Sequence, residues 1–322
     1  MHDDIKGQEG FSPEEAFRIL GHETRLAILH TLWDTQAKDP DEYHEREALS
    51  FAELRKRVGM RDGSQFNYHL KQLIGRFIHQ TDDGYKLRRP GEQIISTILA
   101  GSLTEEVVFD AEPIDDPCPL CGGGVVLDHG TEQSPDHLLI RCTTCEGGWK
   151  LPGLPSGVLS VVPLLLPVGV RSRSLTEMYR AQFTWLKFHI KSMIEGVCPE
   201  CSGTVIATPF ICETHTVSDG QVCTHCGSIF EIQFRRVCSV CKNSWTIPTG
   251  RHIICHPTVA AFDHDHDYET WGHQWLRIET ETIAEQTVVS QDPLEIEITV
   301  IVADDSLDLK LDSEGAVFDL RT

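Results

Sequence analysis

Apolar residues recur at helical spacing several times in the first hundred residues of this 322-residue chain. Ser12 and Pro13 are typical of a helix start, because serine at the N-cap accepts a backbone hydrogen bond and proline is tolerated at the first helical position. Further helices are predicted over Leu26–Trp33, over Phe51–Gly59 and from Ser64, which we expect to cap the fourth helix. The pattern predicts a helical N-terminal region.

The fourth of these helices has one apolar face and one polar face. Its apolar residues, at i, i+4, i+7 and i+8, are expected to be buried: Phe66, Leu70, Leu73 and Ile74. The residues left outside are Gln65, Asn67, Tyr68, His69, Lys71 and Gln72. Glutamine, asparagine and lysine are side chains that read base edges and phosphates from a helix in the DNA major groove. The polar face is therefore a candidate DNA-reading surface.

Two short β patterns follow this helix. Phe77–Thr81 and Tyr85–Arg89 flank a turn that contains Gly84, which is typical of a hairpin. Three cations are expected on the returning strand: Lys86, Arg88 and Arg89. Residues 51–90 hold nine Lys or Arg and four acids, a balance of +5, whereas the whole chain has a formal charge of −21. One basic segment in an acidic chain indicates a nucleic-acid face.

Periodic patterns return in the second half of the chain. Ser174 and Glu177 predict a capping box, and apolar residues at helical spacing continue from there to Gly196. This helix packs between the two modules that flank it or contacts a dimer partner. Period-two patterns near the C-terminus predict an antiparallel meander over Leu294–Val302, Ser306–Leu311 and Ala316–Leu320.

The modules on either side of that helix are rich in cysteine. Ten of the twelve cysteines form five Cys-x-x-Cys pairs, and Cys212 with His215 makes a sixth pair. Two such pairs complete a tetrahedron around zinc. A redox dithiol or buried structural cysteines are the alternatives for a single pair, but six pairs within residues 118–241 favour metal. The candidate ligands of three structural Zn²⁺ ions are Cys118, Cys121, Cys142, Cys145, Cys198, Cys201, Cys212, His215, Cys223, Cys226, Cys238 and Cys241.

The first two pairs are separated by 20 residues that contain a strand-like Leu138–Arg141, an arrangement that resembles a zinc ribbon. The other four pairs can combine in three ways. Nested pairing joins the two outer pairs around the two inner ones, cross-braced pairing joins first with third and second with fourth, and sequential pairing joins neighbours.

We favour nested pairing for two reasons. The outer sequences repeat the first ribbon, including a tryptophan four residues after the last cysteine (Trp149 and Trp245), and Ser218–Gly220 predicts a turn between the inner pairs. The 21 residues between Cys201 and Cys223 favour the cross-braced alternative, because that spacing is close to the spacing in the first ribbon.

Cys255 and four nearby histidines offer one more possible metal site. Their local spacing is irregular, which favours residues without a ligand role: Cys255, His252, His256, His264 and His266.

The sequence contains no pattern of a secreted or membrane protein. The N-terminus lacks an apolar run behind positive charge, and the longest apolar stretch, Val158–Val170, is interrupted by prolines and too short to span a bilayer. We expect a cytoplasmic protein without a membrane partner, whose thiols stay reduced and bind metal.

The N-terminal order of helices and hairpin resembles the winged helix-turn-helix of ArsR-type transcriptional regulators over residues 11–100. Gly21–Leu29 is similar to the second helix of that family, and Ser64–Leu73 is similar to its recognition helix. The resemblance implies binding of double-stranded DNA as a homodimer. Glu92–Ala100 is either the dimerising helix or a helix of the core. The cysteines of metal-sensing members are absent from Phe51–Gly59.

We therefore predict an α+β protein: a winged helix-turn-helix domain over residues 1–101, a first zinc ribbon over 102–172, a connecting helix over 173–196, a double-zinc module over 197–262 and a C-terminal β segment over 263–322. The predicted DNA-binding residues are Arg61, Gln65, Asn67, Tyr68, Lys71, Lys86, Arg88 and Arg89.

This layout and the acidity resemble regulators of halophilic archaea, and they predict a sequence-specific DNA-binding transcription regulator. The zinc half is expected to serve dimerisation, an effector or the transcription machinery. A zinc-scaffolded protein–protein adaptor whose winged helix does not read DNA is the alternative. No nucleophile–base–acid, P-loop or GxGxxG pattern predicts an enzyme.

Overall fold

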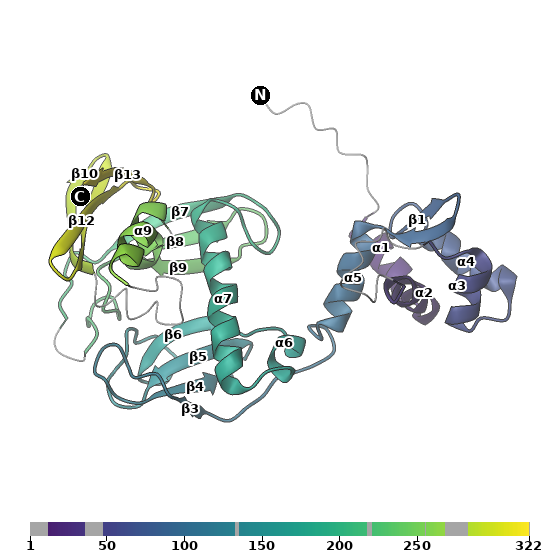
Figure 1. Ribbon diagram of the computed structural model, residues 1–322, viewed down its shortest axis with the longest axis horizontal. Coiled ribbons are helices and arrows are strands. Elements are labelled where there is room, and N and C mark those ends of the chain that lie inside the picture. The colour runs from purple at the N-terminus through teal and green to yellow at the C-terminus, as the bar shows by residue number, and fades with distance from the viewer. Residues whose placement is uncertain are drawn as a thin grey trace. The chain divides into compact units, whose positions relative to one another are not determined.

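The computed structural model describes residues 12–35, 48–132, 135–217, 221–254, 256–267 and 283–321. They form two compact units, drawn in Figure 1. The N-terminal unit comprises Met1–Glu106 with Leu166–Val168, and the C-terminal unit comprises Val107–Leu165 with Gly169–Thr322. Each unit has its own hydrophobic core. The mixed α+β class and the antiparallel sheets confirm the coarse prediction.

The N-terminal unit is mostly helical. Its elements are α1 (Pro13–Leu20), α2 (Glu23–Trp33), α3 (Phe51–Val58), α4 (Gly63–Leu73), the hairpin β1 (Ile78–Thr81) and β2 (Gly84–Leu87), and α5 (Arg89–Leu99). Ser12 caps α1 as predicted, since its hydroxyl accepts a hydrogen bond from the Glu15 N–H. The predicted apolar face of α4 is confirmed for Phe66, Leu70 and Leu73, which are fully buried, whereas Ile74 is half-buried and is the C-cap residue of the helix.

Two predictions about α4 are wrong. The helix begins one residue before Ser64, and Asp62 is its N-cap, with Oδ1 accepting hydrogen bonds from the N–H groups of Ser64 and Gln65 at 2.7 and 3.1 Å. His69, predicted to be outside, is buried, with its ring centroid 4.2 Å from that of His22. Its position three residues after Phe66 and one before Leu70 turns it toward α2 rather than toward solvent.

The hairpin is shorter than predicted, and this moves two cations off it. β2 ends at Leu87, so Lys86 alone of the three predicted cations lies on the strand. Arg88 is the N-cap residue of α5 and donates a hydrogen bond to the Gly75 carbonyl, and Arg89 is the first residue of that helix. Proline in the first turn of α5 explains the early helix start, because its fixed φ is already helical.

α5 belongs to the core of its own unit. Ile95 is buried, and Ile94 and Ile98 pack against the same cluster. This packing supports the core interpretation of the predicted helix Glu92–Ala100, and a dimerising role stays a prediction.

The C-terminal unit is built on three antiparallel sheets. The first contains β3 (Glu112–Ile114), β4 (Val125–His129), β5 (His137–Cys142) and β6 (Val158–Pro163) in that order, and the second contains β7 (Val205–Ile211), β8 (Ile232–Cys238) and β9 (Ser244–Pro248). The third contains β10 (Ile283–Gln291), β11 (Leu294–Val302), β12 (Asp305–Leu311) and β13 (Val317–Arg321). The last three strands confirm the predicted meander.

α7 (Leu175–Ile194) joins the first two sheets, as Figure 1 shows. The predicted capping box is present, because Ser174 accepts a hydrogen bond from the Glu177 N–H while the Glu177 carboxylate accepts one from the Ser174 N–H. Buried α7 residues share one core with Leu138 of the first sheet and Ile247 of the second. Packing between the two modules is therefore the interpretation that the structure supports for this helix.

The third sheet packs on the second one rather than standing apart. Ile232 and Phe234 of β8 share a core with β11 and β12 and with two short helices, α8 (Thr249–Ile254) and α9 (Pro257–Asp265). The predicted boundaries at residues 172, 196 and 262 all lie inside the C-terminal unit. The remaining short helix, α6 (Pro167–Arg171), contains residues of both units.

A buried cation connects α7 to the sheets. The Arg236 guanidinium donates to the carbonyls of Met193 and Ile194 at 3.1 and 3.2 Å and to the carbonyl of Glu314. Cations are favourable at helix C-termini, where carbonyls have no partner within the helix. His252 is also buried beside Phe234, with ring centroids 4.5 Å apart. Burial, with the Arg236 charge, lowers the pKa of His252 to about 3.

This burial predicts part of the acid sensitivity of the fold. Below a pH of about 6.5 the unfolded chain protonates His252, whereas the folded chain does not until the pH nears about 3. Stability is therefore lost as the pH falls through this window. We expect the drop in unfolding free energy between pH 7 and 5 to be about 2 kcal/mol smaller in His252→Leu than in the wild type. Denaturant titrations at both pH values test this, and equal drops would contradict it.

Candidate metal centres

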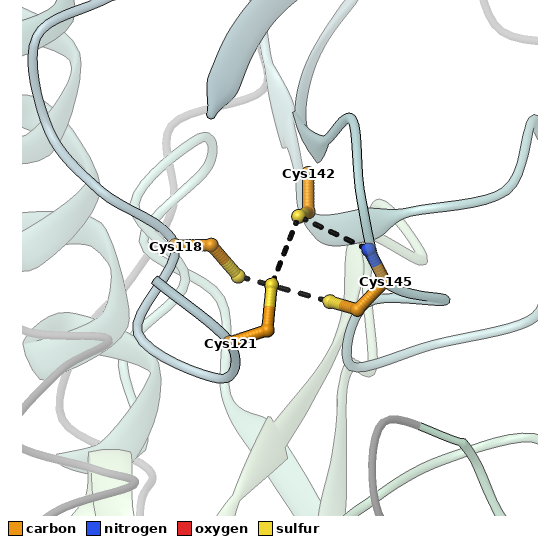
Figure 2. Close-up of side chains that lie close together, drawn as sticks. All are labelled: Cys118, Cys121, Cys142 and Cys145. Atoms are coloured by element: carbon orange, nitrogen blue, oxygen red, sulfur yellow. Dashed lines mark hydrogen bonds between the residues drawn. The ribbon is translucent and has the colours of Figure 1, made fainter. Parts of the chain in front are cut away.

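Twelve ligand-type side chains of the C-terminal unit form three groups. In each group, four ligand atoms all lie within 4.8 Å of one another. In the first group, shown in Figure 2, Cys118 Sγ lies 3.8 Å from Cys145 Sγ and Cys121 Sγ lies 3.6 Å from Cys142 Sγ. A tetrahedral ion with Zn–S bonds of about 2.3 Å requires S···S separations of about 3.8 Å. The group therefore fits such an ion.

The second group has the same dimensions. Cys198 Sγ lies 3.6 Å from Cys241 Sγ, and Cys201 Sγ lies 3.5 Å from Cys238 Sγ. The first pair follows α7 and the second begins at the last residue of β8, so the group joins the start of the second sheet to its central strand. Four sulfur donors in this arrangement suit a thiophilic ion such as Zn²⁺.

The third group combines three thiols with an imidazole. It consists of Cys212, His215, Cys223 and Cys226, and His215 Nδ1 lies 3.5 Å from Cys226 Sγ. Of the three pairings that the sequence leaves open, the grouping is the nested one. The predicted turn Ser218–Gly220 lies outside the described residues.

Four of the six ligand turns share one backbone conformation. The N–H of the first cysteine donates to the carbonyl five residues later, and its own carbonyl accepts from the N–H four residues later. These turns begin at Cys118, Cys198, Cys223 and Cys238. The residue after the second cysteine has a positive φ of 61–72°: Gly122, Ser202, Gly227 and Lys242. Because this conformation is uncommon for non-glycine residues, its recurrence at Ser202 and Lys242 indicates that the ligand geometry imposes it.

Backbone N–H groups around the sulfur atoms favour thiolates. Burial tends to raise the pKa of Cys142, but the N–H groups of Cys145 and Thr144, 3.3 and 3.2 Å from its Sγ, outweigh burial and lower that pKa to about 7. The N–H groups of Thr216 and Cys226 lower the pKa of Cys223 to about 6. Thiolates are the form that binds metal, so the first cysteine of each of these turns is prepared for a cation, whereas burial raises the pKa of Cys145 and of Cys226 to about 11.

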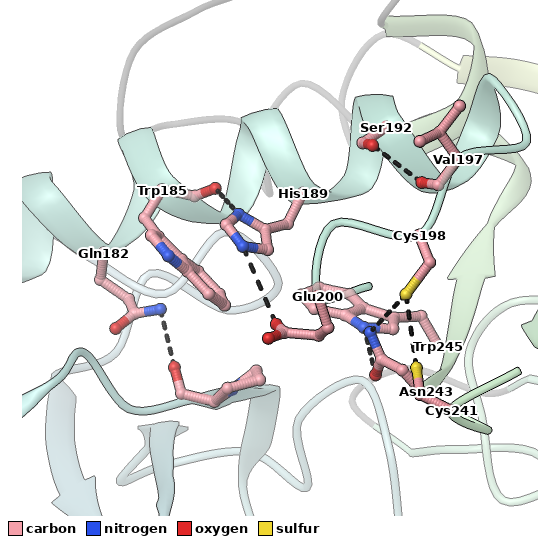
Figure 3. Close-up of polar contacts among 11 residues, drawn as sticks. Gln182, Trp185, His189, Ser192, Val197, Cys198, Glu200, Cys241, Asn243 and Trp245 are labelled. Atoms are coloured by element: carbon pink, nitrogen blue, oxygen red, sulfur yellow. Dashed lines mark hydrogen bonds and ion pairs between the residues drawn. The ribbon is translucent and has the colours of Figure 1, made fainter. Parts of the chain in front are cut away.

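An aromatic stack supports the second group from α7. Figure 3 shows the Trp185 and His189 rings stacked, with centroids 3.5 Å apart, and the Trp245 ring lies 6.3 Å from Trp185. The Trp245 indole N–H donates to Asn243 Oδ1 at 3.2 Å, and the Asn243 amide lies 4.0 Å from Cys198 Sγ. The tryptophan noted after the last cysteine therefore fixes a side chain that contacts a ligand.

The first and third groups are tied together by a short β contact. Lys150 N–H donates to the Gly227 carbonyl at 2.8 Å, and Ile229 N–H donates to the Gly148 carbonyl at 3.0 Å. Trp149, between these bonds, packs on Phe230 with ring centroids 4.9 Å apart. Loss of one group would therefore disturb the other.

Sequence reasoning missed two supporting residues. Asn243 carries no spacing signal, although it lies two residues after the last cysteine of its pair. Gly157 has φ of 89°, and a Cβ there would lie 2.1 Å from the Cys142 carbonyl oxygen. Glycine is therefore required beside the Cys142 turn, and the Pro155-Ser156-Gly157 turn was its only signal.

The predicted DNA-binding residues lie on three elements of the N-terminal unit. Those on or just before α4 are exposed (Arg61, Gln65, Tyr68 and Lys71) or half-buried (Asn67), and Lys86 on β2 is half-buried. Arg88 and Arg89 are exposed but lie at the start of α5, where Arg89 is 3.6 Å from Glu92. Three of the predicted residues on α4 are thus exposed, whereas the hairpin keeps a single predicted cation.

The histidines near Cys255 do not gather. Cys255 lies outside the described residues, His252 is buried and His264 is exposed. Within the described ranges, the three groups above are the ones that bring at least three possible ligands together, and none contains these histidines.

None of the helices in the described segments has both the length and the apolar character that crossing a membrane requires.

Two family models match this chain. A model described as "Domain of unknown function (DUF7347)" matches residues 13–98, and one described as "Domain of unknown function (DUF7351)" matches residues 115–317, more than half of the chain. Searches of curated proteins and of solved structures gave no match. The first match lies in the N-terminal unit and the second in the C-terminal unit.

Each of the three groups is expected to bind one metal ion. Native mass spectrometry of protein purified without chelator should show three zinc ions per chain, and chelation should lower the melting temperature and alter the far-UV spectrum, because the ligand turns bury little apolar surface. Fewer than two bound metals, or an unchanged spectrum after chelation, would contradict this expectation.

The nested grouping predicts which ligands share an ion. In cadmium-substituted protein, Cys198→Ser should shift the ¹¹³Cd resonance coupled to Cys238 and leave the one coupled to Cys223 in place, because the serine changes one donor of a single site. Cys223→Ser provides the reciprocal control. A cadmium coupled to both Cys198 and Cys223 would establish the cross-braced pairing instead.

Proposed function

The chain belongs to the DUF7351 family, and we propose that it is a sequence-specific DNA-binding transcription regulator whose C-terminal unit is held by three structural Zn²⁺ ions. The observation that carries the proposal is the exposed face of α4. Its described polar residues are uncharged or basic, and the helix contains no acid in a chain with 49 acids. An acid-free polar face on one helix is a surface suited to DNA.

The arrangement around α4 supports this role. Phe66 and Leu70 anchor the helix in the core, so Gln65, Tyr68 and Lys71 point away from it. We infer that α2 to β2 form a winged helix-turn-helix, as the ArsR resemblance implies, with α4 as the recognition helix. Glutamine and asparagine make bidentate contacts with adenine edges, and lysine contacts guanine or phosphate.

The charge on the hairpin is smaller than the sequence implied. β1 and β2 contain one lysine and no acid, but Asp82 and Asp83 lie exposed in the turn between them. Arg88 donates a hydrogen bond to the Gly75 carbonyl, and Arg89 lies near Glu92. Non-specific attraction to phosphate is therefore weak, and discrimination has to come from base contacts. Weak phosphate attraction combined with discrimination through base contacts suits a protein that works in concentrated salt, where counterion release contributes little to binding.

Zinc is the proposed ion, and its proposed role is structural. Each group supplies four protein ligands, which complete a tetrahedron and leave no position for water or substrate. A catalytic zinc keeps such a position open.

A protein–protein adaptor is the second candidate. The engagement of Arg88 within the chain favours it, because a wing that reads DNA commonly offers its cations to phosphate. A genome-wide map of bound DNA distinguishes the two functions, since an adaptor would give no reproducible sequence motif.

The α4 face predicts two separable mutant phenotypes. Gln65→Ala and Asn67→Ala should reduce discrimination between cognate and scrambled duplexes by about 1–3 kcal/mol per lost base contact. Lys86→Gln should weaken both duplexes alike, because phosphate contacts carry no sequence information. Affinities measured by fluorescence anisotropy near molar KCl test this separation.

Two variants serve as matched controls. Gln93→Ala on α5 removes a carboxamide and Arg18→Gln on α1 removes a cation elsewhere in the N-terminal unit, and both should leave the two affinities unchanged. If the α4 and hairpin variants fold and bind cognate DNA like the wild type, the unit does not read DNA and the adaptor function replaces our proposal.

A further inference from the structure

The C-terminal unit contains a cavity of about 500 Å³ that the metal centres do not use. One wall is the face of the second sheet that carries Gln233 and Arg235. The cavity is also lined by β6, around Ser160, and by Leu186 and Ile190 of α7. A volume of several hundred Å³ is typical of sites for small organic molecules.

The cavity has an accessible rim and a closed floor. Phe210, Arg235 and Thr246 line it and are exposed, whereas Ser160 and Gln233 line it and are buried. Because Arg235 and Thr246 are paired across β8 and β9, this part of the rim is formed by hydrogen-bonded strands rather than by a loop. A ligand can therefore enter without unfolding the unit.

Aromatic and cationic groups dominate its chemistry. Trp149 and Trp245 line the cavity, as do Arg235 and Arg251. The Arg251 guanidinium lies 5.3 Å from the centroid of the Trp149 ring, a cation–π geometry that fixes both side chains. Rigid aromatic walls bind flat apolar bodies at low entropic cost, and guanidinium groups bind carboxylates through paired hydrogen bonds.

The charge of the lining is opposite to that of the chain. The full sequence holds 49 acids in 322 residues, yet the described lining residues include two arginines and no acid. In a protein with a formal charge of −21, this local excess of positive charge attracts an anion.

One buried polar atom adds a hydrogen-bonding position. His137 lines the cavity, and its Nδ1 atom is buried without a hydrogen-bond partner among the described residues. Buried polar atoms are usually paired, so a ligand or water in the cavity would satisfy this one. Cys226 also lines the cavity, but its sulfur belongs to the third metal group.

We propose that this cavity binds a small organic anion with an aromatic body, of the class of aromatic carboxylates. The tryptophans hold the ring, and the arginines hold the carboxylate. This site goes beyond the proposed function and does not depend on DNA binding.

The test uses the zinc-loaded full chain and three probes. These are 2-naphthoate, its neutral analogue 2-naphthamide, and cyclohexanecarboxylate, which keeps the charge but lacks the aromatic ring. Isothermal titration calorimetry should show one 2-naphthoate per chain. Both other probes should bind roughly tenfold more weakly, because one loses the charge-assisted hydrogen bonds and the other loses the ring contacts.

Variants locate the site. Arg235→Gln changes an exposed residue and should weaken 2-naphthoate roughly tenfold while leaving 2-naphthamide unchanged. Thr246→Trp should fill the rim and abolish binding of both. Arg180→Gln, which removes an equally exposed arginine from α7 outside the cavity, is the matched control and should have no effect.

Three outcomes would overturn the proposal. They are absence of 2-naphthoate binding at about 1 mM, equal affinity for the acid and the amide, and equal weakening by Arg180→Gln and Arg235→Gln. The last outcome would mean that removing any exposed arginine weakens binding, so that the anion does not depend on a contact with Arg235 in this cavity.

Discussion

Thiolates held a few ångströms apart repel one another, and this repulsion is the constraint on which the C-terminal unit depends. Two unit charges 4 Å apart repel by about 4 kcal/mol at an effective dielectric constant of about 20. Each group nevertheless keeps its ligand atoms within 4.8 Å of one another. N–H groups lower the pKa of Cys142 to about 7, while burial raises that of Cys145 to about 11. A cation that all four ligands share removes this conflict and allows every thiol of a group to ionise.

The same groups determine where the sheets begin and end. Cys142 is the last residue of β5 and Cys238 is the last residue of β8, so an ion bound at each group fixes the end of a strand. Cys198 and Cys241 close a loop that contains β7, β8 and the whole third group. α7 fills the space between these two sheets. Its buried face consists of Phe183, Leu186 and Ile190. An ion at each of these groups would thus stabilise a different part of the unit from the part that hydrophobic packing stabilises.

The sequence predicts those features whose signal is local. The Ser174–Glu177 capping box, the α4 core face and the meander strands all rest on residues within a few positions of one another, and all are present. The metal-ligand residues could be predicted for the same reason, since Cys-x-x-Cys is a local pattern. Which pairs combine depends on the fold, so spacing alone left three arrangements open.

Features that depend on tertiary contacts escaped prediction. His69 is buried because its ring packs against His22 at the start of α2. Arg88 is held by its hydrogen bond to the Gly75 carbonyl. β10 was not predicted, because the described side chains in this edge strand are exposed or half-buried and give a weak alternating signal. The cavity had no sequence signal, since its lining residues come from nine separate segments between residues 137 and 251.

Two surfaces of this acidic chain lack acids, and a single physical argument accounts for both. α4 has no Asp or Glu, and neither do the described residues of the cavity lining. In molar salt the screening length falls to about 3 Å, so distant charges neither attract nor repel a ligand. An acidic side chain in direct contact with a phosphate or carboxylate would still repel it, because no ions lie between the two groups to screen their charges. A chain with a large negative charge can therefore bind anions where its contact surfaces exclude acids, and we infer that these two surfaces are the places where it does so.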